Sequence, residues 1–361
     1  MAPMRVARLV LATVCLLAAA ALLAACGGDS GDSDSTASSG GSAESRPAPA
    51  PAQFPAADGR TLEEVLKLGD KPAELKIEPG AMVFYPGANR YPFEIYEPSG
   101  TEVTDAEVAL YMAPVPAVEP GAKSKSGNKG PVAKAEGQAL EKPAIGPFPA
   151  RIESLATDPE FRSQAPADAP DPTRVVYSTE LEFPHRGVWR IAALVKEDGE
   201  LGGKLLPGVV VGEFKAIPRV GDEAPLIHTP TAAEAGGDLS RITTRVPPDT
   251  QNKVDYADAL GKEPIVLLFA TPRFCQSRVC GPVVDQTEQA QREYGDQAAF
   301  IHMEIYNQND PGDGVRPQVR AFHLPSEPWL FTIDRAGVVS ETIEGAFGAE
   351  LLDEAIEKAI R

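Results

Sequence analysis

Apolar and polar residues alternate along the middle of the chain, in short runs that proline and glycine separate. Seven such runs lie between Glu74 and Ile217: AELKIEPG, NRYPFEIYEPSG, EVALYMAP, ARIESLA, RVVYSTELEFP, GVWRIAALVKEDG and GVVVGEFKAI. A period of two is that of a strand with one buried face, so the pattern predicts an antiparallel β-sandwich. A short helix is expected just before the first run, in DGRTLEEVLKLG.

The pattern changes after VGDEAP at residues 220–225. LGKEPIVLLFATP predicts a buried strand, and QSRVCGPVVDQTEQAQREYG has apolar residues at helical spacing up to Gly295. AAFIHMEIY predicts a second strand, PQVRAFHL a helix or turn, PWLFTIDRAGVVSETIEG a β-hairpin and GAELLDEAIEKAI an amphipathic helix. Strands that alternate with helices in this way indicate an α/β unit.

Length and charge limit the organisation and the partners of the chain. Because 361 residues exceed one typical domain, we expect two folded units, an all-β domain at 59–218 and an α/β domain at 219–361. The formal net charge of −18 offers no basic stripe that would neutralise phosphates. The composition therefore predicts no nucleic-acid partner.

The first 26 residues are typical of a targeting segment. Arg5 and Arg8 precede an apolar run of fifteen residues, and the segment ends in LAAC, which resembles a bacterial lipobox with Cys26 as the lipidated residue. The polar stretch that follows, within residues 27–58, is expected to be a disordered tether. We therefore expect a lipoprotein signal peptide and a protein held by lipid on the extracytoplasmic face of the cell membrane.

Two cysteines remain able to react once the expected signal peptide and the lipidated residue are set aside. Cys15 leaves with the signal peptide and Cys26 carries lipid, so only Cys275 and Cys280 remain. Outside the cytoplasm two neighbouring thiols tend to be oxidised to one another. The pair is thus a candidate disulfide, and its role can be redox, metal binding or structural.

The all-β part resembles an immunoglobulin-like sandwich in its last hairpin. RVVYSTELEFPHRGVWRIAALVK is similar to the corresponding hairpin of YtkA-like and copper-resistance-protein-like domains. The similarity is general to such sandwiches, and Trp189 is expected in the core.

The last 140 or so residues resemble a thioredoxin-like fold. VGDEAP, LGKEPIVLLFATPRFC and SEPWLFTIDRAGVV carry the resemblance, which is to extracytoplasmic thiol-disulfide oxidoreductases and the wider peroxiredoxin-related group. It implies a fold in which Cys275 stands at the start of the helix after the central strand, where the helix dipole stabilises a thiolate. It also implies that Cys280 is the resolving cysteine and Pro328 the cis-proline that faces the sulfurs.

The resemblance implies thiol-disulfide exchange with a protein partner and requires no cofactor. Arg273 and Arg278 are expected to add positive potential around Cys275. Two features depart from the family. Glu327 adds a carboxylate that is expected to raise the thiol pKa, and Leu268 occupies the place of the usual buried acid.

The spacing C-x4-C also departs from the usual C-x-x-C. Five residues on a regular helix separate two thiols by about 140° around the axis, so a direct disulfide requires that the first turn unwind. Three alternatives follow. The pair can be a structural disulfide in a non-catalytic binding module. It can bind Cu(I) with His323, as in SCO-like proteins. It can also act as a peroxidase like peroxiredoxin Q, although Thr271 lies four residues before Cys275 instead of three.

Overall fold

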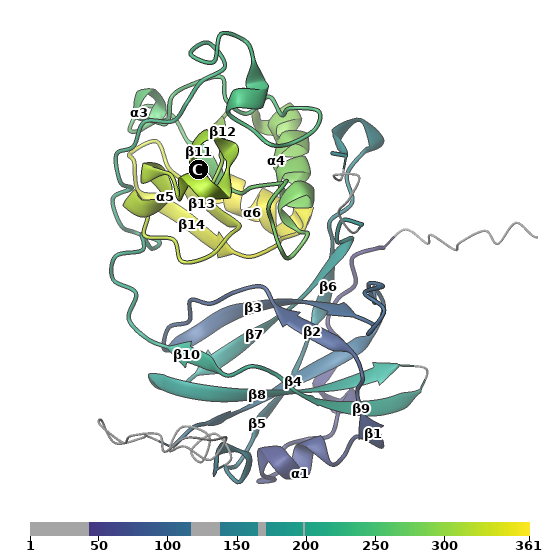
Figure 1. Cartoon of the computed structure of the whole chain (residues 1–361). Helices are drawn as coiled ribbons and strands as arrows, with labels where there is room; N and C mark the ends of the chain where they lie inside the picture. Colours follow the sequence, from purple (N-terminus) through teal and green to yellow (C-terminus); the bar gives the residue numbers. More distant parts are fainter. Residues whose placement is uncertain (1–42, 117–137, 165–170, 198) are drawn as a thin grey trace, which may run out of the picture. The chain divides into compact units, whose positions relative to one another are not determined.

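The computed structural model describes residues 43–116, 138–164, 171–197 and 199–361 (Figure 1). The expected signal peptide, the expected lipidation site Cys26 and the first part of the expected tether lie outside these residues. Residues 42–361 form one compact unit, so the expected division at 218/219 stays a prediction. Among the described residues, every helix is too short or too polar to cross a bilayer.

The N-terminal half contains two β-sheets. In the first sheet the strand order is β1-β9-β8-β4-β5, and β10 pairs with β8; its strands are β1 (Lys71–Pro72), β4 (Glu107–Pro114), β5 (Ile145–Pro149), β8 (Gly187–Glu197), β9 (Glu200–Leu205) and β10 (Val209–Val211). In the second sheet the order is β2-β3-β7-β6, from β2 (Lys76–Pro79), β3 (Gly87–Tyr96), β6 (Arg151–Ser154) and β7 (Val175–Phe183). All seven predicted runs contain a strand, whereas β1, β5 and β9 were not predicted because their glycines and prolines interrupt the alternation.

The two sheets share one apolar core, so this part of the chain is a β-sandwich. Along β3, Tyr91, Phe93 and Ile95 all enter that core, as the two-residue period of a strand requires. Trp189 joins them and is 1% exposed, which confirms its expected core position. The alternate residues of β3 consequently face away from the sandwich core.

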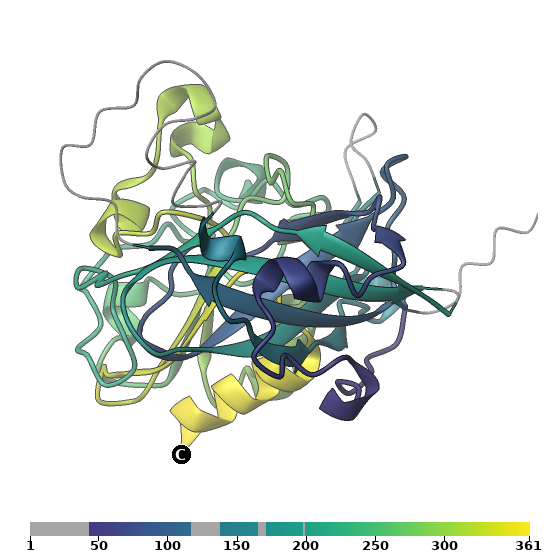
Figure 2. The same cartoon turned by 90° about the horizontal axis from the view of Figure 1, so that it is seen from below.

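The short helix predicted before the first strand is α1 (Leu62–Leu66). Thr61 and Glu64 cap it reciprocally, since Thr61 accepts from the amide of Glu64 and the Glu64 carboxylate accepts from the amide of Thr61. Leu62 and Val65 pack with residues of β4 and β8 on the outer face of the first sheet (Figure 2).

Residues 43–58, which belong to the expected tether, make defined contacts with the rest of the fold. The backbones of Arg46 and Ile152 exchange hydrogen bonds of 2.8 and 2.9 Å. A short 3₁₀ helix, η1 (Pro51–Gln53), follows, and Phe54 is 4% exposed in the cluster under α1. The polar, proline-rich composition did not indicate these contacts, which the backbone of Arg46 and the buried ring of Phe54 make.

The C-terminal half is a four-stranded sheet between helices (Figure 1). Its order is β12-β11-β13-β14, from β11 (Ile265–Phe269), β12 (Ala299–Met303), β13 (Trp329–Ile333) and β14 (Val339–Glu344). β11 and β12 are parallel, and β13 is antiparallel to both of its neighbours. The helices are α3 (Tyr256–Ala259), α4 (Cys280–Tyr294), α5 (Pro317–Ala321) and α6 (Ala349–Ile360), and four 3₁₀ turns complete the chain: η2 (Pro159–Phe161), η3 (Leu239–Arg241), η4 (Asn307–Asn309) and η5 (Pro311–Asp313).

Residues of α4 and α6 cover one face of this sheet, and residues of α3 and α5 cover the other. The strand order, the strand directions and the two helical layers are those of a thioredoxin-like fold. The strands, the hairpin and the last helix were predicted by their periodicity, and PQVRAFHL forms α5. The fold places the loop after β11, with both cysteines, at the carboxyl end of a central strand.

The outer face of β3 contacts the C-terminal half through Arg90. Its guanidinium donates to the carboxylate of Glu153 at 3.1 Å, to the carbonyl of Ala346 at 2.6 Å and to that of Glu344 at 3.4 Å. The side chains of Arg90 and Glu153 are 18% and 8% exposed. One planar cation thus ties two strands of the sandwich to the end of β14.

We expect Arg90→Ala to lower the free energy of unfolding by about 2–4 kcal/mol, because it removes one partner of a largely buried ion pair. Arg186→Ala is the matched control, since Arg186 pairs with Glu213 at the surface and should change stability by no more than about 0.5 kcal/mol. Urea denaturation of the purified proteins measures both. Equal losses in the two variants would contradict a special role for Arg90.

Candidate functional site

Cys275 and Cys280 form a disulfide, with their Cα atoms 5.9 Å apart. Cys275 follows β11 after a turn in which its amide donates to the carbonyl of Thr271 at 3.1 Å. Cys280 is fully buried and Cys275 is partly exposed. A reagent in solution therefore meets the sulfur of Cys275 first.

The helix after the central strand begins at Cys280, directly after Val279, the first residue with the predicted helical spacing. On a regular helix the two Cα atoms would be roughly 8.6 Å apart, too far for a disulfide. Pro282 explains the start, because it has no N–H to donate to the carbonyl of Arg278 and is tolerated only in the first turn. Residues 276–279 therefore stay outside α4, and Cys275 does not stand on the helix as the family resemblance implied.

Pro328 precedes β13 and follows a cis peptide bond from Glu327, as the resemblance implied. The carboxyl group of Glu327 approaches the disulfide, with its Oε2 atom 4.0 Å from Sγ of Cys280. The structure thus brings Cys275, Cys280 and the residue next to Pro328 together.

Burial raises the pKa of Glu327 to about 8, and the negative charge of Glu304 adds to this effect. A hydrogen bond from the backbone of Thr271 acts in the opposite direction. Below this pKa the group is mainly protonated, so it places no negative charge beside the sulfurs. The sequence had suggested a carboxylate that opposes a thiolate; burial makes it a neutral acid that can donate a proton.

Glu304 is a site residue that the motif analysis missed. It follows β12 and is fully buried, and its Oε1 atom accepts from the amide and the hydroxyl of Thr244 at 2.6 and 2.7 Å. Its Oε2 atom has no hydrogen-bond partner among the described residues. Only its place inside the apolar run FIHMEIY could have indicated it. Leu268 is buried in the core, as expected. The buried acid is instead Glu304, which follows the adjacent strand β12.

The two arginines near the disulfide direct their charges to aromatic rings. The guanidinium of Arg273 lies 5.6 Å from the ring centre of Phe274, and that of Arg278 lies 4.7 Å from the ring centre of Tyr96 in β3. The hydroxyl of Ser277 is the polar group nearest to Cys275 among the described hydrogen bonds, at 3.4 Å from Sγ.

Besides the cysteines, the copper alternative requires His323 and the peroxidase alternative requires Thr271. In the described part of the chain, no three His, Cys, Asp or Glu side chains are grouped to hold a metal ion, so His323 does not join the cysteines. The hydroxyl of Thr271 is buried and has no hydrogen-bond partner among the described residues. His302 is also buried, where it bonds Asp249 at 2.9 Å and the carbonyl of Ala270 at 3.0 Å.

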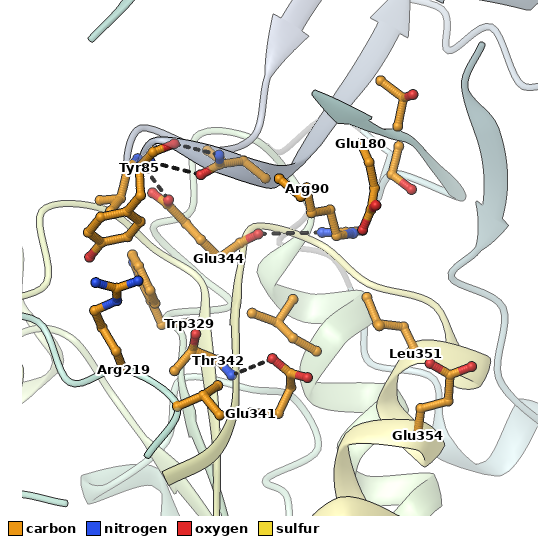
Figure 3. Close-up of a pocket in the computed structure, with 18 of the residues that line it drawn as sticks. Tyr85, Arg90, Glu180, Arg219, Trp329, Glu341, Thr342, Glu344, Leu351 and Glu354 are labelled. Atoms are coloured by element: carbon orange, nitrogen blue, oxygen red, sulfur yellow. Dashed lines mark hydrogen bonds between the residues drawn. The ribbon is translucent and has the colours of Figure 1, made fainter. Parts of the chain in front are cut away.

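A cavity of about 650 Å³ lies apart from the disulfide, beside β14 and α6 (Figure 3). Its polar groups are largely bound within the protein: Glu344 accepts from the amides of Met82 and Val83, and Arg219 lies 4.4 Å from the ring centre of Tyr85. Neither cysteine lines this cavity. The cavity is therefore not part of the candidate site around the disulfide.

No family model and no curated protein matches the chain. Among solved structures it is similar to a thioredoxin-family thiol:disulfide interchange protein from Chlorobium tepidum TLS, with 17% identity and a TM-score of 0.28 over 42% of this chain and 100% of that one. It is also similar to a putative thiol:disulfide interchange protein DsbE from Chlorobium tepidum, with 20% identity and a TM-score of 0.27 over 40% and 99% of the two chains. The strand order and strand directions of the C-terminal half assign its fold.

Burial of Glu327 predicts how stability depends on pH. The pKa rises from 4.5 to about 8 on folding, so the folded state binds more protons between these values and loses stability as the pH rises through them. We expect the stability of the wild type, relative to Glu327→Gln, to fall between pH 5 and pH 8 and to level off above. Denaturant unfolding of both proteins across this range measures the difference. A difference that is independent of pH would contradict the raised pKa.

Pro282 predicts a shift in the thiol-disulfide equilibrium. Pro282→Ala restores the missing N–H, so α4 can extend toward Cys275 once the disulfide is reduced. An interior helical proline costs about 3 kcal/mol, so the reduction potential should rise by up to about 60 mV. Equilibration in glutathione buffers measures it, and Pro311→Ala in a surface turn is the control. An unchanged potential would show that the reduced helix does not extend.

Proposed function

We propose that this chain exchanges disulfides with a protein partner outside the cytoplasm, while a lipid on Cys26 anchors it to the membrane. The observation that carries the proposal is the disulfide of a partly exposed Cys275 and a buried Cys280, with the buried carboxyl group of Glu327 beside the inner sulfur. A disulfide that only braced the fold would need no acid at this position.

The exchange begins when a thiolate of the partner attacks Sγ of Cys275. A mixed disulfide forms, the bond between Cys275 and Cys280 breaks, and its electron pair leaves on Sγ of Cys280. Glu327 donates a proton to that sulfur, which cannot draw one directly from solvent because it is buried. The acid thus stabilises the leaving group.

A second thiol of the partner then attacks its own sulfur in the mixed disulfide and releases Cys275. The partner leaves as a disulfide, Cys275 takes the proton of the second thiol, and Glu327 regains from solvent the proton that the first thiol had lost, so two electrons and two protons have passed to this chain. In the opposite direction, the Cys275 thiolate attacks a disulfide of the partner, and Cys280 resolves the intermediate after it gives its proton to Glu327. The electron donor or acceptor is an extracytoplasmic dithiol or disulfide protein, since cytoplasmic thiols do not reach this compartment.

The partner class follows from the same geometry. Phe274 and Tyr306 pack edge to face at 6.2 Å beside Cys275, and both are partly exposed. An aromatic pair next to a reactive sulfur suits a peptide segment that carries its cysteine among apolar residues.

Variants of the two cysteines test the proposal. Cys280→Ser leaves Cys275 without its resolving partner, so a mixed disulfide between Cys275 and an extracytoplasmic protein should accumulate in cells. Non-reducing gels and mass spectrometry of the linked peptides measure it, and Cys275→Ser should give none. The wild-type pair should also have a reduction potential above about −300 mV.

A lower potential together with no adduct at Cys275 would favour a structural disulfide instead. Peroxide consumption that depends on Cys275 would favour the peroxidase, and stoichiometric Cu(I) binding that is lost in His323→Ala would favour copper binding.

A further inference from the structure

The segment between the two cysteines is held by the sandwich. The amide of Thr173, two residues before β7 begins, donates to the carbonyl of Arg278 at 3.3 Å. The hydroxyl of Thr173 lies 3.3 Å from the carbonyl of Ser277, to which it can donate. Both carbonyls belong to residues 276–279, which lie between the cysteines and outside α4.

Tyr96 completes this contact from the end of β3. Its hydroxyl lies 2.8 Å from that of Thr173, and its ring carries the guanidinium of Arg278. Arg278 also donates to the carbonyl of Gly100 at 3.5 Å. Thr173 and Tyr96 are each 2% exposed, so their hydroxyl groups exchange hydrogen bonds with the protein and not with water.

The contact supplies a hydrogen-bond donor that the helix lacks. In a longer α4 the carbonyl of Arg278 would accept from residue 282, but Pro282 has no N–H. The amide of Thr173 takes that role. Arg278 adopts a φ of 61°, a left-handed conformation that is unfavourable for a residue with a Cβ atom and persists only where its surroundings hold it.

The apolar side of the contact reaches the inner cysteine. Val279 and Cys280 belong to one cluster of buried residues with Leu155 and Val176, which come from the sandwich. Residues of the sandwich therefore share an apolar cluster with Cys280, next to the backbone contact made by Thr173.

We propose that Thr173 and Tyr96 are positioning residues for the disulfide, and that the sandwich stabilises the oxidised form by holding residues 276–279 in the conformation that the disulfide requires. Since coupling is reciprocal, breaking the disulfide weakens the contacts that the sandwich makes with residues 276–279. The strength of these contacts thus depends on the redox state of the disulfide. We call the contacts of Thr173 and Tyr96 with residues 276–279 the clamp. This inference rests on the proposed function in so far as the disulfide must be reduced and re-formed during use.

The reaction that tests the clamp uses glutathione. Two molecules of reduced glutathione supply two electrons and two protons, the bond between Cys275 and Cys280 breaks, and one molecule of oxidised glutathione is released. The ratio of oxidised to reduced protein across a series of these buffers gives the equilibrium constant for disulfide formation.

We expect Thr173→Val and Tyr96→Phe to lower that constant by about fivefold to tenfold each, because each loses a buried hydrogen bond of the clamp. Tyr91→Phe is the matched control. Tyr91 is buried in the same strand as Tyr96, but its hydroxyl has no hydrogen-bond partner among the described residues. It should change the constant by less than twofold. Equal constants in all four proteins, or larger constants in the two clamp variants, would overturn the proposal.

Hydrogen exchange of the wild type gives a second measurement that needs no substitution. The amide of Thr173 should exchange slowly in the oxidised protein and faster by at least tenfold after reduction with dithiothreitol. The same rate in both states would contradict the clamp.

The two proposals fail separately in these experiments. If the clamp variants shift the equilibrium but Cys280→Ser traps no partner, the clamp stands and the disulfide is structural. If the partner is trapped but the equilibrium constants and the exchange of the Thr173 amide do not change, exchange stands and the clamp is wrong.

Discussion

The absence of one N–H group, at Pro282, determines how the candidate site is built. Because the carbonyl of Arg278 has no helical donor, α4 cannot run back to Cys275, and the four residues between the cysteines take a path that brings both sulfurs together. The oxidised pair, the exposed turn and the contact with the sandwich all follow from this local constraint. In thiol proteins whose helix includes both cysteines, reduction is favoured by the helical turn that forms. In this protein Pro282 prevents that helical turn from forming, so the turn does not favour reduction.

A second constraint is electrostatic. Glu304 and Glu327 are two acids placed near one another in a buried region, and only one of them has strong donors, from Thr244. Burial raises the pKa of Glu327 and the negative charge of Glu304 adds to this effect, so Glu327 keeps its proton. That proton lies beside the buried sulfur. The arrangement gives the inner cysteine an acid, although β11 itself carries only apolar side chains.

The periodicity of apolar residues was enough to predict the β-rich part and the α/β part of the chain, because strands and helices with one buried face repeat their apolar residues at fixed intervals. It failed where the cause was not periodic. The turn before α4 depends on one proline, residues 43–58 are held by the burial of Phe54 and the pairing of Arg46, and β5 and β9 contain glycine or proline and are held by pairing with β4 and β8. The cysteines and Pro328 were found from local motifs, whereas Glu304 and Thr173 were not. Their roles arise only from residues that the fold brings close together.

The hydrogen bond of Thr173 to the segment between the cysteines also bears on how the protein folds. In most helices the groups that satisfy the first turn come from the few residues around it, so the helix end forms with the helix. Here the partner hydroxyl lies 104 residues earlier in the chain. Closing so long a loop is slow compared with forming a helix. The site is therefore complete only after the sandwich has formed and docked, and a nascent chain would expose both cysteines separately until then.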